Sequence, residues 1–259
     1  MNYGFFDYKY NIQGFQSDLY STQHIIYIFA VIIFSIAFGI AARKTDHKKI
    51  ETYLKILSVI AAVMEITKIS WESYYDITTG RGFNYFGILP LYSCSLFIYT
   101  LFFAAWGKGT VKKSCLSFLS TICMVCGAIG VVYCNGLNYY PFWTFGAFYS
   151  LFFHAAMFFN GFFLLTTNYY KPDWKDVYFG WLPMVALSVI ALPVNYIIGS
   201  DYMQIYEGSG VPLMSDLAVV LTKVGLRPVF SVLMLASYMI LGAIVVAVCK
   251  VVSKLEKKA

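Results

Sequence analysis

Residues 22–42, TQHIIYIFAVIIFSIAFGIAA, decide the fold, because they form an apolar run with no Asp, Glu, Lys or Arg. About 20 consecutive apolar residues in a helix span the hydrocarbon core of a bilayer. The run therefore predicts a membrane-spanning helix. The residues before it contain no charged region followed by an apolar one, so we expect no cleaved signal peptide and this helix serves as its own insertion signal.

The whole chain shares the character of this stretch. Its 259 residues are 59% hydrophobic and 12% charged, whereas ordinary soluble domains are about 25% charged. So few charges cannot cover the surface of a soluble globule, and the apolar content excludes a disordered chain. A transmembrane barrel would show short alternating segments, whereas this chain shows long unbroken apolar runs. The composition predicts an all-α, polytopic membrane protein.

Further apolar runs follow the first one, and together they predict a seven-transmembrane helix bundle that forms a single membrane domain over residues 1–259. The predicted spans are residues 22–42, 50–73, 86–107, 114–133, 146–167, 176–198 and 228–249. Residues 213–224 are also apolar, but a run of this length is too short to span. They are predicted to form an interfacial or re-entrant helix on the outer side.

The positions of Lys and Arg predict the orientation. Of the 19 basic residues, 13 fall in the loops after the first, third and fifth spans and in the C-terminal tail. Because cytoplasmic loops carry the excess of Lys and Arg, we expect the N-terminus outside and the C-terminus in the cytoplasm of a multi-pass protein of the cell membrane. The net charge of +6 describes these loops and not a basic soluble domain, so no nucleic-acid partner is expected.

Polar residues within the predicted spans are the main clues to function, because an ionisable group at bilayer depth costs roughly 2.5–3.5 kcal/mol. They gather in the outer half of the predicted bundle and comprise His24, Glu65, Lys68, Tyr92, Cys94, His154 and Asn195. This segregation predicts a polar cavity open toward the outer side. Glu65, Lys68 and Glu72 share one helix face at spacings that allow pairing, which fits a structural cluster as well as a site.

Cys94 and His154 lie at matched predicted depth on different helices and form a candidate nucleophile and base. A thiol in apolar surroundings is inert, but a neighbouring imidazole can take its proton and generate the thiolate. Tyr92 and Ser93 would then offer hydroxyl donors to an oxyanion. Taken singly, a buried cysteine is more often a small hydrophobe. We predict Cys94 and His154 as catalytic residues, with a substrate-binding set of His24, Glu65, Lys68, Tyr92 and Asn195.

Other chemical motifs are weak or missing. Cys123 and Cys126 form a C-x-x-C, but it lies in the middle of a predicted helix, without the accessible electropositive setting of a redox pair. The chain has three His residues and no H-E-x-x-H, P-loop or G-x-G-x-x-G. We therefore expect no metal and no cofactor.

Three blocks of the sequence resemble the YwaF-like integral membrane proteins of bacteria: Leu89-Pro90-Leu91-x-x-Cys94, His154 on a Phe-rich segment, and Pro193-x-Asn195-Tyr196-x-x-Gly199-x-x-Tyr202. His24 and Glu65 with Trp71 also fit, so the resemblance covers most of the chain. That family is distantly similar to transmembrane protein 164, a cysteine-dependent acyltransferase that acts on lysophospholipids. The chain departs from the bacterial pattern at Tyr92, where His is usual, and at Asp201, where Asn is common.

The resemblance implies that Cys94 accepts the acyl group and that His154 is its partner. The leading hypothesis is a lipid acyltransferase in which Lys68 or His24 holds the phosphate or oxyanion. Its partners would be membrane lipids, with a phospholipid or lysophospholipid as substrate. The alternative is a small-molecule or lipid binding or transport protein with an intramembrane polar site and no covalent chemistry. A third hypothesis is a scaffold subunit whose polar cluster only specifies helix packing.

Overall fold

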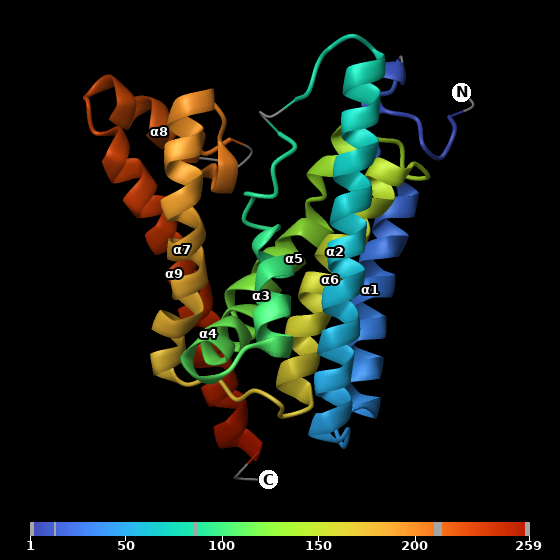
Figure 1. Ribbon diagram of the computed structural model, residues 1–259. Helices are drawn as coiled ribbons and strands as arrows, with labels where there is room; N and C mark the ends of the chain where they lie inside the picture. Colours follow the sequence, from blue (N-terminus) through green and yellow to red (C-terminus); the bar gives the residue numbers. More distant parts are fainter. Residues whose placement is uncertain (1–2, 13, 85–86, 210–213, 257–259) are drawn as a thin grey trace. The chain divides into compact units, whose positions relative to one another are not determined.

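The computed structural model describes residues 3–12, 14–84, 87–209 and 214–256. Within these ranges the regular structure is entirely helical (Figure 1), which confirms the predicted all-α class. The chain divides into two compact units. The first contains Met1–Gly82 and Cys123–Lys171, and the second contains Phe83–Ile122 and Pro172–Ala259.

The first unit contains three long helices, α1 (Thr22–Ala41), α2 (His47–Thr78) and α6 (Phe145–Thr166), and the shorter α5 (Ile122–Val132). Local side chains determine where α1 and α2 begin. The Ser21 hydroxyl accepts a hydrogen bond from the His24 backbone N–H, and the Asp46 carboxylate accepts one from Lys48. Each cap satisfies a backbone donor that has no partner within the helix.

Glycine lets α6 approach its neighbours in the first unit. A Cβ added at Gly39 of α1 would lie 2.8 Å from the Phe162 ring, and one added at Gly127 of α5 would overlap the backbone at Phe158. Helices in membranes pack through small residues of this kind. The N-terminal segment covers one end of the unit, where the Trp71 indole N–H donates to the Phe6 carbonyl oxygen at 2.9 Å.

The second unit is built around α7 (Trp174–Ile198), which packs against α4 (Gly109–Ser120) and α9 (Arg227–Glu256). The shorter helices α3 (Leu96–Trp106) and α8 (Met214–Lys223) pack on α4 and α9 respectively. The Trp181 indole N–H of α7 donates to the Leu235 carbonyl oxygen of α9 at 2.8 Å. This bond joins the two longest helices of the unit within the first half of each.

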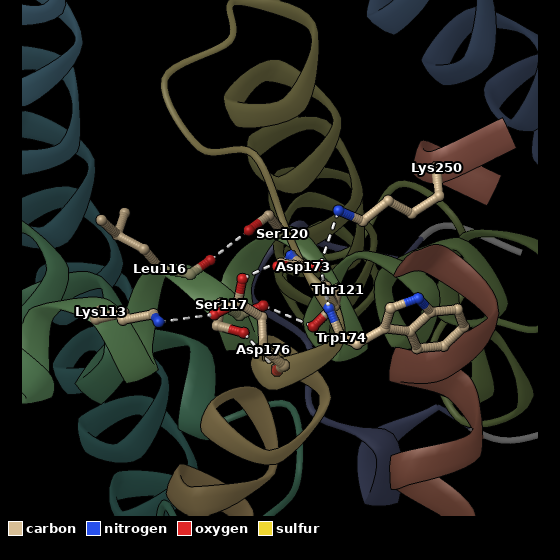
Figure 2. A network of polar contacts seen from close by, with 9 residues as sticks. All are labelled: Lys113, Leu116, Ser117, Ser120, Thr121, Asp173, Trp174, Asp176 and Lys250. Atoms are coloured by element: carbon tan, nitrogen blue, oxygen red, sulfur yellow. Dashed lines mark hydrogen bonds and ion pairs between the residues drawn. The ribbon is translucent and has the colours of Figure 1, made fainter. Parts of the chain in front are cut away.

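A polar network fixes the start of α7 (Figure 2). Asp173 and Asp176 form a capping box at the first turn. Lys113 of α4 lies 3.5 Å from an Asp176 carboxylate oxygen, and Lys250 of α9 lies 2.7 Å from Asp173. The Ser117 hydroxyl donates to the Asp176 carbonyl oxygen at 2.7 Å. The capping residues of α7 are thus also its links to α4 and α9.

Five stretches of the described residues are long and apolar enough to cross a membrane: Thr22–Ala41, Gly109–Asn138, Phe145–Thr166, Trp174–Ile198 and Arg227–Glu256. They support a multi-pass membrane protein. The seven spans, the single domain and the orientation of the termini stay predictions.

Two predicted spans are interrupted. The span expected at 86–107 is helical only over Leu96–Trp106, because residues 88–95 form turns and bends around Pro90, which lacks a backbone N–H. The span expected at 114–133 breaks at Thr121, whose hydroxyl donates to the Ser117 carbonyl oxygen at 2.6 Å. The helix predicted over residues 213–224 appears as α8, and its position on the outer side stays a prediction. Leu213, the first residue predicted for that helix, and Phe86, the first residue of the span predicted at 86–107, lie outside the described residues.

Candidate functional site

Cys94 belongs to the second unit and lies in the turn that leads into α3. Its side chain is half-buried, and its carbonyl oxygen accepts a hydrogen bond from the Phe97 N–H at 3.0 Å. Ser95, the next residue, is the N-cap of α3. The Ile98 N–H likewise donates to the Ser95 carbonyl oxygen at 3.0 Å, while the helix dipole places partial positive charge at this end of α3. Negative charge near Cys94 is therefore favoured at this end of α3.

The loop after α7 holds this turn in place. The Leu89 N–H donates to the Tyr202 hydroxyl oxygen at 3.2 Å, and the rings of Tyr92 and Tyr202 meet edge to face at 5.0 Å between centroids. Tyr202 is fully buried. The chain segment that carries Cys94 is therefore positioned by a tyrosine more than a hundred residues away in the sequence.

Asn195 in turn fixes Tyr202. The Asn195 amide nitrogen donates to the Tyr202 carbonyl oxygen at 2.9 Å, and its oxygen accepts from the Tyr202 N–H at 2.8 Å and the Ser200 hydroxyl at 2.9 Å. Asn195 is fully buried, so these bonds compensate its desolvation. The structure thus gives Asn195 a loop-holding role. The predicted contacts of Asn195 and Tyr92 with substrate stay predictions.

A largely apolar cavity of about 610 Å³ lies between α3, α4 and α7 of the second unit. Leu91 and Leu96, which flank Cys94 in the sequence, both line it. The buried residues Thr100 and Cys115 form part of its wall, while Phe103 at its edge is 45% exposed. The volume is in the range of small-molecule sites, ~300–1,000 Å³.

The predicted charged cluster is present in the first unit. The Tyr149 hydroxyl donates to one carboxylate oxygen of Glu65, and Lys68 lies 3.2 Å from Glu72 and 5.9 Å from the centroid of the Tyr149 ring. Glu65 is 5% exposed, and its second carboxylate oxygen has no hydrogen-bond partner among the described residues. The structure therefore brings Glu65 and Lys68 together through Tyr149.

The two histidines of the first unit are held differently. The Tyr20 N–H donates to Nδ1 of His24 at 3.0 Å, and Nε2 lies 3.0 Å from the Val131 carbonyl oxygen, so both ring nitrogens are engaged. In His154 Nδ1 lies 2.8 Å from the Ser150 carbonyl oxygen. Because a carbonyl oxygen only accepts, Nδ1 carries the proton in this contact, and in the neutral ring Nε2 is the nitrogen without a proton.

The two predicted catalytic residues fall in different units, Cys94 in the second and His154 in the first. Their pairing stays a prediction, as do the substrate-binding roles of His24, Glu65 and Lys68. Among the described residues no group of three or more His, Cys, Asp or Glu side chains is suited to a metal ion.

Sequence reasoning missed Tyr149 and the cavity. Tyr149 belongs to an aromatic run, FYSLFF at 148–153, in which nothing marks one ring as polar. The cavity is made by residues from three helices, and no local pattern joins them. Tyr202 was visible only as the last residue of the Asn195 block, and no signal in the sequence gave it a partner.

Comparison with curated proteins and with solved structures finds no match. A family model matches residues 19–252, which covers most of both units. The match supports the relation to transmembrane protein 164, while the YwaF-like bacterial assignment stays a prediction. With nearly its whole length matched by that model, the chain belongs to the TMEM164 family.

Proposed function

We propose that this protein is a lipid acyltransferase of the cell membrane that carries the acyl group as a thioester on Cys94. The observation that carries the proposal is the position of Cys94 between Leu91 and Leu96, two residues that line an apolar cavity. In this proposal a hydrocarbon chain bound in the cavity would bring its ester to the turn that carries Cys94. Membership of the TMEM164 family is consistent with this activity in a membrane protein.

The reaction has two balanced steps. The Cys94 thiolate attacks the carbonyl carbon of a phospholipid ester, a C–S bond forms, the C–O bond breaks, and the leaving oxygen of the lysolipid takes a proton. The hydroxyl of a lysophospholipid acceptor then attacks the thioester, transfers the acyl chain and restores the thiol. The proposal assigns the proton of the Cys94 thiol, and later that of the acceptor hydroxyl, to Nε2 of His154.

The environment of Cys94 supports an anionic intermediate. Cys94 lies just before the positive end of the α3 dipole, and partial positive charge at that end would stabilise the oxyanion of a tetrahedral intermediate. The proposal also includes seven spans, an external N-terminus and a cytoplasmic C-terminus, an arrangement that would put the charged cluster of Glu65 and Lys68 in the outer half.

The test uses the full chain reconstituted in phospholipid vesicles with an acyl-labelled phospholipid and a lysophospholipid acceptor. We expect Cys94→Ala to abolish both the hydroxylamine-sensitive label on the protein and the labelled product. Cys249→Ala is the matched control, because Cys249 is also half-buried, and it should retain both. A Cys94→Ala protein that still transfers labelled chains would refute the proposal.

A second candidate function is ligand binding or transport without covalent chemistry. It is favoured by the buried carboxylate oxygen of Glu65 that has no hydrogen-bond partner in the described part of the chain. A buried carboxylate oxygen without a hydrogen bond is costly, and a bound cationic or hydrogen-bonding ligand would offset that cost. In the vesicle assay this function predicts binding that is unaffected by Cys94→Ala and is lost in Glu65→Gln, with no label on the protein.

A further inference from the structure

The cavity of the second unit exists because small residues stand where three helices face one another. Thr100 of α3, Ser114 and Cys115 of α4, and Ala186 of α7 all line it. Pro183, inside α7, lines it as well. Protein interiors are otherwise close-packed, so Leu or Phe at any of these positions would occupy the space. The hollow is therefore specified by the side chains themselves.

The lining offers an occupant little polar interaction. The Thr100 hydroxyl donates to the Leu96 carbonyl oxygen at 2.8 Å, and the Tyr99 hydroxyl donates to the Pro90 carbonyl oxygen at 2.9 Å. Asp, Glu, Lys, Arg and His are all missing from the residues that line the cavity. The Tyr99 and Thr100 hydroxyls already have partners, and most of the other lining side chains are apolar, so the chemistry that fits this cavity is hydrocarbon.

The lining of the cavity extends along the helices and begins at Leu91 and Leu96, on either side of Cys94 in the sequence. On α3 its lining runs from Leu96 to Phe103, and on α7 from Leu182 to Ile190, which corresponds to about 10–12 Å at 1.5 Å per residue. Ile190 and Phe103 are 57% and 45% exposed, so an occupant can enter from the side. A laterally open, apolar hollow that follows the helices over this length can accommodate a linear hydrocarbon chain.

We propose that this cavity binds the acyl chain and that the small side chains at Thr100, Ser114 and Ala186 determine which chain lengths are accepted. The proposal rests on the proposed function in so far as the chain is the one that Cys94 transfers. Ala186 lies near the middle of the lining of α7, so a larger side chain there blocks the part of the cavity beyond it while the end beside Cys94 stays open.

The experiment separates chain binding from transfer. The full chain carrying Cys94→Ser, which cannot form the thioester, is reconstituted in vesicles and photolabelled with fatty acids of increasing length that carry a diazirine at the methyl end. We expect the label on α3, α4 and α7. Adding Ala186→Phe should lower labelling by the long chains about tenfold relative to the short ones, the effect of losing two buried methylene contacts.

Val189→Phe is the matched control, because Val189 is an exposed residue of α7 that does not line the cavity, and it should leave the length profile unchanged. Ala186→Leu should give a dependence of labelling on chain length between those of the wild type and Ala186→Phe. It tests the inference with a smaller side chain in case Ala186→Phe does not fold. Label elsewhere in the chain, or equal profiles for Ala186→Phe and Val189→Phe, would overturn the inference. If labelling depends on chain length but the wild-type protein forms no thioester, the cavity binds the chain as inferred here. The proposed acyl-enzyme on Cys94 would then be refuted.

Discussion

The hydroxyl oxygen of Tyr202 accepts a hydrogen bond from the backbone N–H of Leu89 at 3.2 Å, and this bond joins the loop after α7 to the turn that carries Cys94. Tyr202 is itself held by two hydrogen bonds to the buried amide of Asn195. The orientation of the candidate nucleophile thus depends on a side chain and a loop that do not touch substrate in the proposed reaction.

Tyr202→Phe should loosen the turn without unfolding the second unit, because the ring still packs against Tyr92. The lost hydrogen bond is worth about 0.5–1.5 kcal/mol. We expect faster alkylation of Cys94 by a maleimide and slower acyl transfer. Tyr196→Phe is the control, since the Tyr196 side chain is half exposed. Unchanged alkylation in Tyr202→Phe would show that the bond does not restrain Cys94.

Asn195→Leu should destabilise the second unit strongly. The substitution leaves the N–H and carbonyl groups of Tyr202 and the Ser200 hydroxyl without their partners in a buried place, at a cost on the order of 2–5 kcal/mol in total. The measurement is the midpoint of thermal unfolding in detergent. Asn195→Asp keeps the acceptor oxygen, and its unfolding midpoint should fall less than that of Asn195→Leu. Equal midpoints for Asn195→Leu and the wild type would contradict the loop-holding role.

Gly130→Ala should displace the His154 imidazole, because a Cβ added at Gly130 would overlap that ring. Overpacking of this kind typically costs about 1–3 kcal/mol. We expect a lower unfolding temperature together with altered reactivity of His154 toward diethylpyrocarbonate. Ile129→Ala, at an exposed position of the same helix, should change neither. If His154 reacts identically in Gly130→Ala, the close approach of α5 and α6 is not what holds the ring.

Acid should weaken the start of α7. The Lys250 ammonium, which is hydrogen-bonded to Asp173, holds the pKa of that carboxyl below its ordinary value of 3.8, and the Trp174 N–H assists. A carboxyl whose pKa is lowered in the folded state stabilises the fold at pH values above its ordinary, unfolded-state pKa. This stabilisation is lost as the pH falls through the folded-state pKa.

We therefore expect the midpoint of thermal unfolding to fall between neutral pH and about pH 3. The fall should be larger in the wild type than in Asp173→Asn. The difference is expected to be small, because the side chain of Asp173 is exposed and its ion pair is screened by solvent. Identical acid profiles for the two proteins would mean that Lys250 does not stabilise the folded carboxylate.

The helical class and most helix positions could be predicted from the sequence, because a charge-free apolar run such as residues 22–42 has one stable state in a bilayer. The interruptions at Pro90 and Thr121 were harder to predict, since hydropathy counts apolar residues and does not register a missing backbone donor or a side chain that bonds to its own helix. Among the site residues, Lys68 and Glu72 were correctly paired because their spacing on α2 alone sets their distance.

A helical, apolar chain with membrane-spanning runs can be predicted from the residues alone, because hydropathy and helical spacing are local properties of each segment. The packing of distant segments is needed to see that Asn195 and Tyr202 hold the Cys94 turn, that Tyr149 joins the charged cluster, and that small residues of α3, α4 and α7 line a cavity. Those relationships depend on which helices pack together and at what rotation. That outcome is set by side-chain volumes and hydrogen bonds summed over distant segments, and no local stretch of sequence contains it.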